Sequence, residues 1–274
     1  MQKINNKCSV IVSSYDGSED LWEPFFTLFF RYWPDCPYPI YLITNYKIYN
    51  HDRVTTIAVG EHKGWASNMR VVLKKIPTPY VMCLIEDLFI EKPVDSAYID
   101  SLVEYIDDKK VAYIRLFPSP LPDHDFTNNL NLGLISKGAP YRASLTAALW
   151  DKKILNDLLV DGENIWQAEL GGTERSNNVS APFLSVKKPA LIYHDRTAVV
   201  AGKWMYYAVK LCKREGLKID LKKRKIDYFW HINLRFDQFR KYPTMRKIRS
   251  IPLVGTISAK VFRFTLDAMR RFLQ

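Results

Sequence analysis

Glycine is scarce in this sequence, at 11 of 274 residues, and the glycine-rich loops that cradle phosphates are missing. Neither GxxxxGK[ST] nor GxGxxG occurs, which disfavours a P-loop nucleotide hydrolase and a dinucleotide-binding fold with the second motif. No Ser-His-Asp or Cys-His arrangement stands out either, which weakens the interpretation as a hydrolase with a Ser or Cys nucleophile.

Paired cysteines and long apolar runs are also absent. The four cysteines lie far apart and form no CxxC pair, so we expect reduced, structural thiols in a cytosolic protein. No stretch reaches the roughly 18 apolar residues in a row that predict a membrane-spanning helix. The apolar run near residue 10 is too short for a signal peptide, so we expect a cytoplasmic protein.

Excess positive charge is missing from most of the chain and concentrated in its last quarter. Residues 203–274 hold 19 Lys and Arg against 5 Asp and Glu, a net +14, whereas residues 1–202 hold 21 against 24, a net −3. We therefore predict a catalytic domain over residues 1–205 and a basic helical region over residues 206–274.

Strand-like and helix-like runs alternate along the first 202 residues. This alternation predicts an α/β fold with a mostly parallel sheet and helices on both faces. Strands are expected at 8–16, 38–45, 53–59, 80–87 and 111–118, and helices at 20–33, 64–76 and 95–108. Further along we expect a strand or turn at 141–150, a helix at 151–162 and a strand pair at 183–195.

Two adjacent carboxylates, Glu86 and Asp87, end the apolar run YVMCLIED. A buried carboxylate without a partner is costly, so a strand that ends in two usually delivers them to a cation, a ligand or a basic partner. The alternative is a pair of solvated acids at a strand end, paired with Arg70 or Arg115. Because ligands bind at the carboxyl ends of strands in such sheets, we expect these acids to line a cleft.

Ser13, Tyr15 and Asp16 follow the first expected strand in the same way, which makes the two loops candidates for one shared cleft. Their hydroxyl and carboxylate groups suit hydrogen bonds to a nucleotide base and its ribose. An ordinary polar turn is the competing interpretation.

Several segments resemble a known family. The opening SVIVSSYD, the helix after it and the strand that ends in EDLF resemble nucleotide-sugar glycosyltransferases with the GT-A fold, whose acidic motif, usually Asp-x-Asp, ends a central strand. The stretches GWASNMRVVLKKIPTPYVMCLIEDLFIEKPVD, YRASLTAALW and NIWQAELGGTERS are similar to bacterial sugar transferases found among surface-polysaccharide genes. The resemblance covers roughly residues 8–205.

The resemblance implies a role for the acidic pair. Asp87, with Glu86, would hold the donor diphosphate through a divalent cation such as Mn or Mg, and Ser13, Tyr15 and Asp16 would bind the nucleotide of a UDP-sugar. Leu88 stands where Asp-x-Asp would put its second acid, so the need for a metal stays open. Late in the chain, a histidine in the neighbourhood of His194 completes the metal site in some GT-A enzymes, although a lone histidine is more often a hydrogen-bonded core or surface residue.

Two further residues complete the predicted site. Glu169 follows Trp166 in WQAELGG, and a carboxylate partly desolvated by that ring would have a raised pKa suited to a general base. The resembled fold often places its base in this region, whereas a helical Glu is usually a surface residue. Arg70 could pair with phosphate oxygens.

The segment after Pro252 is amphipathic, with Val261, Phe264 and Phe272 on one side and Lys and Arg on the other. This pattern fits a helix at an anionic membrane interface, or a helix that docks on the catalytic domain. Nucleic acid is the rival partner for the basic charge, but no nucleic-acid-binding motif is legible.

Together these patterns predict a glycosyltransferase at the inner face of the cell membrane. It would move a sugar from a nucleotide sugar to a glycan or a lipid-linked acceptor in surface polysaccharide synthesis. The alternatives are a nucleotidyltransferase that acts on sugar phosphates and a non-catalytic basic protein that binds lipid or nucleic acid.

Overall fold

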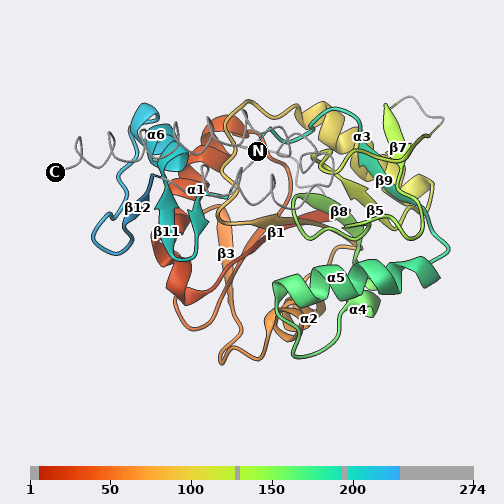
Figure 1. Ribbon diagram of the computed structural model, residues 1–274, viewed down its shortest axis with the longest axis horizontal. Helices are drawn as coiled ribbons and strands as arrows, with labels where there is room; N and C mark the ends of the chain where they lie inside the picture. Colours follow the sequence, from red (N-terminus) through yellow and green to blue (C-terminus); the bar gives the residue numbers. More distant parts are fainter. Residues whose placement is uncertain (1–5, 127–129, 193–196, 229–274) are drawn as a thin grey trace, which may run out of the picture.

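A computed structural model describes residues 6–126, 130–192 and 197–228 of the chain. Its centre is a nine-stranded sheet with the order β3-β2-β1-β4-β8-β5-β9-β7-β6, shown in Figure 1. A separate three-stranded sheet has the order β10-β11-β12. The described chain is therefore a mixed α/β protein.

The first four strands are parallel, as the alternating pattern predicted. β1 pairs with both β2 and β4, and β2 also pairs with β3. The strands are β1 (Cys8–Ser13), β2 (Ile40–Thr44), β3 (Val54–Ala58) and β4 (Tyr80–Ile85), and the helices between and after them are α1 (Glu19–Tyr32), α2 (Trp65–Lys75) and α3 (Ser96–Asp108).

The second half of the sheet is not mostly parallel, which corrects that prediction. β8 (Ala148–Asp151) lies between β4 and β5 (Tyr113–Arg115) and runs antiparallel to both. β9 (Phe183–Val186) is parallel to β5, whereas β7 and β6 are each antiparallel to their inner neighbour. The remaining elements here are β6 (His124–Asp125), β7 (Leu132–Leu134), α4 (Lys152–Leu158) and α5 (Ile165–Arg175). Residues 187–192 form no strand, so the predicted strand pair is reduced to β9 within the described residues.

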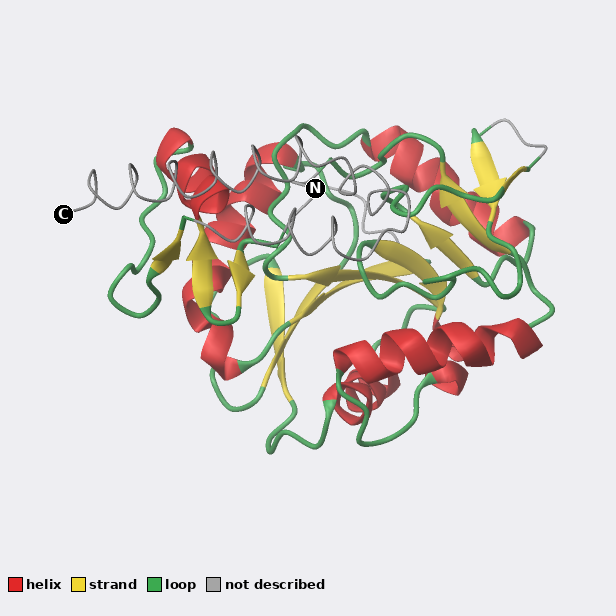
Figure 2. Ribbon diagram, viewed as in Figure 1, coloured by secondary structure: helices red, strands yellow, loops and turns green. Residues whose placement is uncertain are grey.

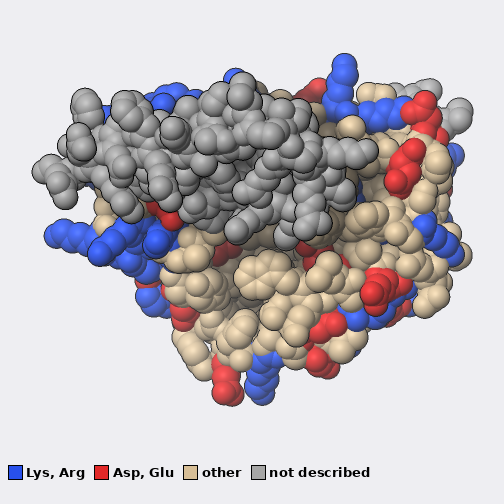
Figure 3. Space-filling model, viewed as in Figure 1, with Lys and Arg blue, Asp and Glu red and all other residues tan. Residues whose placement is uncertain are grey.

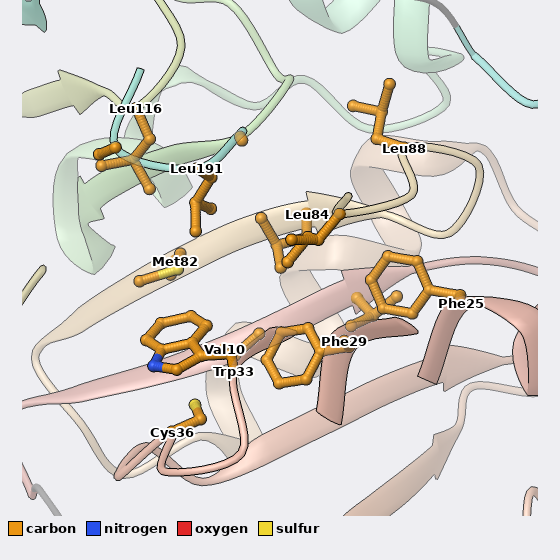
Figure 4. Packing of buried hydrophobic residues seen from close by; sticks show 14 of the residues in the cluster. Val10, Phe25, Phe29, Trp33, Cys36, Met82, Leu84, Leu88, Leu116 and Leu191 are labelled. Carbon is orange, nitrogen blue, oxygen red and sulfur yellow. The ribbon is translucent and has the colours of Figure 1, made fainter. Parts of the chain in front are cut away.

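Helices cover both faces of the sheet, which confirms the layered prediction (Figure 2). Side chains alternate along each strand, so Val10 and Val12 of β1 enter the core under α1 and α3, while Ile11 enters the core under α2, α4 and α5. Figure 4 shows part of the first core, where Val10, Met82 and Leu84 lie near Phe25, Phe29 and Trp33. The four cysteines are buried free thiols, as predicted.

The chain after β9 packs back onto the first half of the molecule. β10 (Val199–Val200), β11 (Lys203–Met205) and β12 (Ile226–Asp227) form the small sheet, and α6 (Tyr206–Arg214) follows β11 directly. α6 buries Ala208, Leu211 and Cys212 in the same core as β1 and α1. The described part of residues 206–228 is thus packed against the predicted catalytic domain, and the boundary at residue 205 stays a prediction.

A buried ion pair fastens this returning segment. Arg224 Nε donates to Asp20 Oδ2 at 2.7 Å and its Nη2 donates to Asp20 Oδ1 at 3.1 Å and to the Gly17 carbonyl at 2.7 Å. The two side chains are only 9% and 7% exposed. Burial alone would raise the pKa of Asp20, but hydrogen bonds from Arg224 and Lys223 outweigh it, so the pKa is lowered. The loop after β1 and the segment before β12 are therefore held together by charge-assisted hydrogen bonds.

No helix in the described ranges has the length and apolar character needed to cross a membrane. The predicted amphipathic helix after Pro252 lies outside the described residues. Within them, Lys and Arg side chains gather at the left edge of the face in Figure 3, over the region of β11 and β12.

Candidate functional site

The candidate site lies where the order of the sheet reverses direction. From β1 the chain moves outward to β2 and β3, then crosses back to β4 on the other side of β1. Ser13 pairs with Ile85 at the carboxyl ends of β1 and β4, and Glu86 N donates to Ser13 O at 3.4 Å. In open α/β sheets this reversal point is where ligands bind. The two predicted loops are thus adjacent.

The acidic pair at the end of β4 is buried rather than solvated. Glu86 is 6% exposed, and burial raises its pKa well above the usual range. Burial also raises the pKa of Asp87, and repulsion from Glu86 raises it further. Among the described residues, Asp87 Oδ1 is buried without a hydrogen-bond partner. Two acids that repel each other, one with an unpaired oxygen, favour a bound cation or a donor group.

Arg70 and Arg115 form their hydrogen bonds elsewhere, so the alternative in which they pair with Glu86 or Asp87 is wrong. Arg115 donates to the carbonyls of Pro120 and Tyr141, and Arg70 donates to the Leu159 carbonyl. The groups that lower the pKa of Glu86 are instead the Ser18 hydroxyl, the backbone N–H of Glu86 itself, the Ser14 hydroxyl and the charge of Arg224. The two serines and Arg224 lower the pKa of Glu86 and do not lower the pKa of Asp87.

The loop after β1 is held in place by two tryptophans. Trp65 Nε1 donates to Ser13 Oγ and Trp22 Nε1 donates to Ser14 Oγ, each at 2.7 Å. Tyr15 is half exposed and its ring covers Gly17, where an added Cβ would lie 2.3 Å from a ring carbon. A side chain at position 17 would therefore force the half-exposed Tyr15 ring to move.

Asp16 joins the loops after β1 and β2. Its carboxylate accepts hydrogen bonds from the backbone N–H groups of Asn45 at 2.8 Å, Tyr46 at 3.0 Å and Lys47 at 3.3 Å. These bonds give Asp16 a structural role. A nucleotide that binds to the carboxylate oxygens of Asp16 would have to share them with three backbone N–H donors. The role of Asp16 in nucleotide binding stays a prediction.

Glu169 lies at the same edge of the sheet. Its Oε1 accepts hydrogen bonds from Ser144 Oγ at 2.8 Å and Leu145 N at 3.0 Å. Residues 144–147 precede β8, and because β8 runs antiparallel to β4, they lie at the carboxyl end of β4. The α5 carboxylate therefore shares an edge with Glu86 and Asp87. Trp166 does not desolvate it as expected, because the indole is 72% exposed to solvent.

The other two predicted site residues are not brought to this edge by the described contacts. Besides its bond to Leu159, Arg70 pairs with Asp161 at 3.3 Å, so its guanidinium faces the connection between α4 and α5. His194 lies outside the described residues. The chain on either side of it is bound to the acidic segment, since Glu91 N donates to Ile192 O and Ala198 N donates to Asp87 O.

No cluster of three or more His, Cys, Asp or Glu side chains suited to a metal ion occurs among residues 6–126, 130–192 and 197–228. Asp87 nevertheless fits a cation that is held mainly by substrate oxygens. Its unpaired Oδ1 is a carboxyl oxygen without a hydrogen-bond donor, and Mg²⁺ sites often use one or two carboxylates plus phosphates.

The sequence patterns missed the groups that hold the site together. Ser144, Ser18 and Arg224 carry no motif, and Arg224 contacts Asp20 across 204 positions of sequence. The two serines follow no spacing that would separate them from ordinary turn residues. Only Ser14 stood in a segment, SSYD, that the sequence had already marked as a candidate loop.

No protein-family model matches this sequence, and no curated protein sequence matches it either. Three solved structures are similar in fold. TarS 1–349 of S. aureus in complex with UDP-GlcNAc is 13% identical with a TM-score of 0.45, and the match covers 76% of this chain and 65% of that chain. The mannosyltransferase PcManGT of Pyrobaculum calidifontis in complex with GDP-Man and Mn²⁺ is 11% identical with a TM-score of 0.46, and the match covers 74% of this chain and 61% of that chain. GalNAc-T7 with UDP, GalNAc and Mn²⁺ is 9% identical with a TM-score of 0.47, and the match covers 66% of this chain and 42% of that chain.

The chain spans less than two thirds of the length of each of these structures. All three TM-scores lie below 0.5, so we carry no residue role and no ligand from them to this chain.

Proposed function

We propose that this protein is a GT-A-type glycosyltransferase that moves a sugar from a nucleotide sugar, most simply a UDP-sugar, to an acceptor hydroxyl. The observation that carries the proposal is the buried pair Glu86 and Asp87 at the reversal point between β1 and β4, with Asp87 Oδ1 unpaired. The sequence resemblance of residues 8–205 to such enzymes, whose acidic motif ends a central strand, agrees with the position of this acidic pair.

Glycosyl transfer makes two demands on the site. Negative charge develops on the departing diphosphate, and the acceptor hydroxyl must lose a proton in an inverting reaction. A divalent cation, when bound, would neutralise the diphosphate charge, and Asp87 with Glu86 would hold it on the protein side. Ser13 and Tyr15 lie beside these acids on the loop after β1, where they would orient the nucleotide.

Glu169 is the proposed general base. One of its oxygens, Oε1, is fixed by Ser144 Oγ and Leu145 N, which sets the direction of the carboxylate. A general base must lie within hydrogen-bonding distance of the hydroxyl that it deprotonates. A carboxylate that is already held in one orientation loses less freedom when it reaches the reactive geometry. The acceptor would therefore enter from the α5 side of the edge and the donor from the α1 side.

We further propose that the enzyme works at a membrane surface, on a lipid-linked or growing glycan in surface polysaccharide synthesis. The support is the net +14 of residues 203–274 and the amphipathic segment after Pro252. Anionic lipids attract such charge at about 1 kcal/mol for each Lys or Arg near the surface.

A screen of nucleotide sugars by thermal shift tests the proposal, with and without Mn²⁺ or Mg²⁺. A ligand at about 100 times its dissociation constant stabilises a protein by roughly 2.7 kcal/mol, which such a screen detects. Asp87→Asn keeps the shape of the side chain and removes its charge, so it should abolish the shift with the matching nucleotide sugar. An unchanged shift and full transfer activity in Asp87→Asn would overturn the assignment. Release of diphosphate from a nucleoside triphosphate and a sugar phosphate would identify a nucleotidyltransferase instead.

A further inference from the structure

Trp166 and Leu170 form an exposed apolar stripe on α5. They are 72% and 58% exposed and stand four positions apart, so they are neighbours on one side of the helix. Other tryptophans of the described chain are far more buried, with Trp22, Trp33, Trp150 and Trp204 at 2% exposure or less. Two large apolar side chains side by side on an exposed helix surface form a candidate contact surface for a ligand.

The stripe is carried by a rigid helix end. Asn164 and Gln167 form a reciprocal capping box, with both hydrogen bonds at 3.0 Å, so the first turn that carries Trp166 is fixed. Arg175 binds Glu163 in a two-pronged ion pair at 3.0 and 2.8 Å. An aromatic ring on a fixed turn loses little freedom when it binds, so the surface is pre-organised.

The start of α5 also adjoins the candidate site. Ala66 N, in the first turn of α2, donates to Glu163 O at 3.1 Å, and the neighbouring Trp65 donates to Ser13 Oγ at 2.7 Å. Trp166 precedes Glu169 by three positions, a spacing that puts two side chains on adjacent parts of one helical surface. Trp166 therefore lies about one helical turn before Glu169, whose carboxylate we propose as the base.

We propose that Trp166, with Leu170, is the platform on which a pyranose ring of the acceptor stacks. This inference rests on the proposed function and names its acceptor class as a glycan. A pyranose has an apolar face of C–H groups and a rim of hydroxyls, so the face covers the indole while a rim hydroxyl reaches Glu169. The exposed amide of Gln167 borders the stripe and can bind a second hydroxyl.

Charge and size exclude two other occupants. Asp161, Glu163, Glu169 and Glu174 lie on α5 or just before it, and the two cations paired with members of this group, Arg70 and Arg175, are bound to Asp161 and Glu163. An anionic lipid surface would be repelled there. Two side chains also offer much less area than the roughly 800 Å² that each partner buries in a stable protein interface.

Binding is tested first without any donor. The indole N–H signal of Trp166, identified by its absence in Trp166→Phe, is followed by NMR during titration with maltotriose and with triacetylchitotriose. We expect one of these sugars to shift this signal in a saturable way, and we expect Trp166→Ala to bind that sugar about tenfold more weakly. If neither sugar shifts the Trp166 signal, the platform is wrong.

Kinetics then connect the platform to the reaction. In Trp166→Ala the stimulation of UDP release by the bound sugar should need about tenfold more sugar than in the wild type. Tyr206→Ala, which removes an exposed ring on α6, is the matched control and should behave as wild type. Equal stimulation in Trp166→Ala overturns the inference. A wild-type protein that binds sugar but no nucleotide sugar would refute the proposed function and leave the platform standing.

Discussion

At the scale of single residues, Glu86 and Asp87 make the stability of the protein depend on pH. Burial raises the pKa of Glu86 to about 7 and that of Asp87 to about 8. The unfolded chain loses these protons near pH 4, whereas the folded chain keeps them up to the raised values. Because the folded state binds more protons in this window, its stability must fall as the pH rises from about 4 to about 8.

We predict that Asp87→Asn flattens this dependence. One titrating group changes the free energy of unfolding by at most about 1.4 kcal/mol per pH unit, and the variant lacks one such group. Urea unfolding between pH 5 and 8 in the presence of a chelator measures the slope. A wild-type slope in Asp87→Asn would show that Asp87 is ionised and paired in the folded protein.

A second prediction at this scale concerns Glu169. Loss of a general base typically lowers the rate about 100- to 10,000-fold, so Glu169→Gln should lose most turnover and still bind the donor. Gln keeps an oxygen that can accept from Ser144 Oγ and Leu145 N, so the fold should be retained. Reduced donor affinity with normal turnover at saturation would place Glu169 on the donor side instead.

At the scale of elements, the Asp20–Arg224 pair joins the start of α1 to the segment before β12. Removal of one partner from a buried pair leaves an uncompensated charge and costs about 3–5 kcal/mol. Lys223 keeps its ion pair with Asp20 at 2.7 Å, so we predict that Arg224→Met lowers the free energy of unfolding by less than this amount but by more than the about 0–1 kcal/mol of a surface pair.

The matched control for Arg224→Met is Lys153→Met in the exposed pair with Asp157, whose side chains are 83% and 53% exposed. Exposed pairs contribute about 0–1 kcal/mol, so this change should be nearly neutral. Chemical denaturation of both variants gives the comparison. Equal losses would mean that the buried pair adds no more than a surface one.

Sequence patterns predicted elements well wherever the determinant is local. The β-branched run of β1 and the apolar spacing of α1 are complete within 6 and 14 residues, and both were confirmed. The position of β8 could not be predicted because strand order depends on which distant strand it pairs with. Residues 141–150 were expected as a strand or turn, and β8 begins only at Ala148.

The same distinction holds within the site. The carboxyl ends of β1 and β4 follow from the alternation of elements, so Ser13, Glu86 and Asp87 were found together. The environment of Glu169 was predicted from its sequence neighbour Trp166, but it is determined by Ser144 and Leu145, more than 20 positions away. Side-chain direction on a helix depends on the tertiary partner, which adjacent residues do not reveal.

At the scale of the whole molecule, the uneven charge leads to a prediction about membranes. A chain that ends before Pro252 loses the apolar residues Val261, Phe264 and Phe272 and keeps the upstream Lys and Arg. Its attachment would be electrostatic and would weaken as salt shortens the screening length. We expect it to leave anionic vesicles at moderate salt, while the intact chain leaves only in part and both act on a soluble acceptor.

Cosedimentation with vesicles at several salt concentrations measures this difference. If the shortened chain binds vesicles as well as the intact chain does, the membrane role of the segment is wrong. If it aggregates instead, the segment is part of the core.

The insertion of β8 between β4 and β5 has a consequence for how the chain is made. β8 begins at Ala148, 63 positions after the end of β4 at Ile85, and the two halves of the described sheet meet only through it. At about 5–20 residues per second, the ribosome needs roughly 3–12 seconds to cover that distance. During this time the apolar strand β4 has a free edge, which is a template for pairing with other chains. The length of this interval is set by the sequence distance between β4 and β8, so no increase in final stability can shorten it.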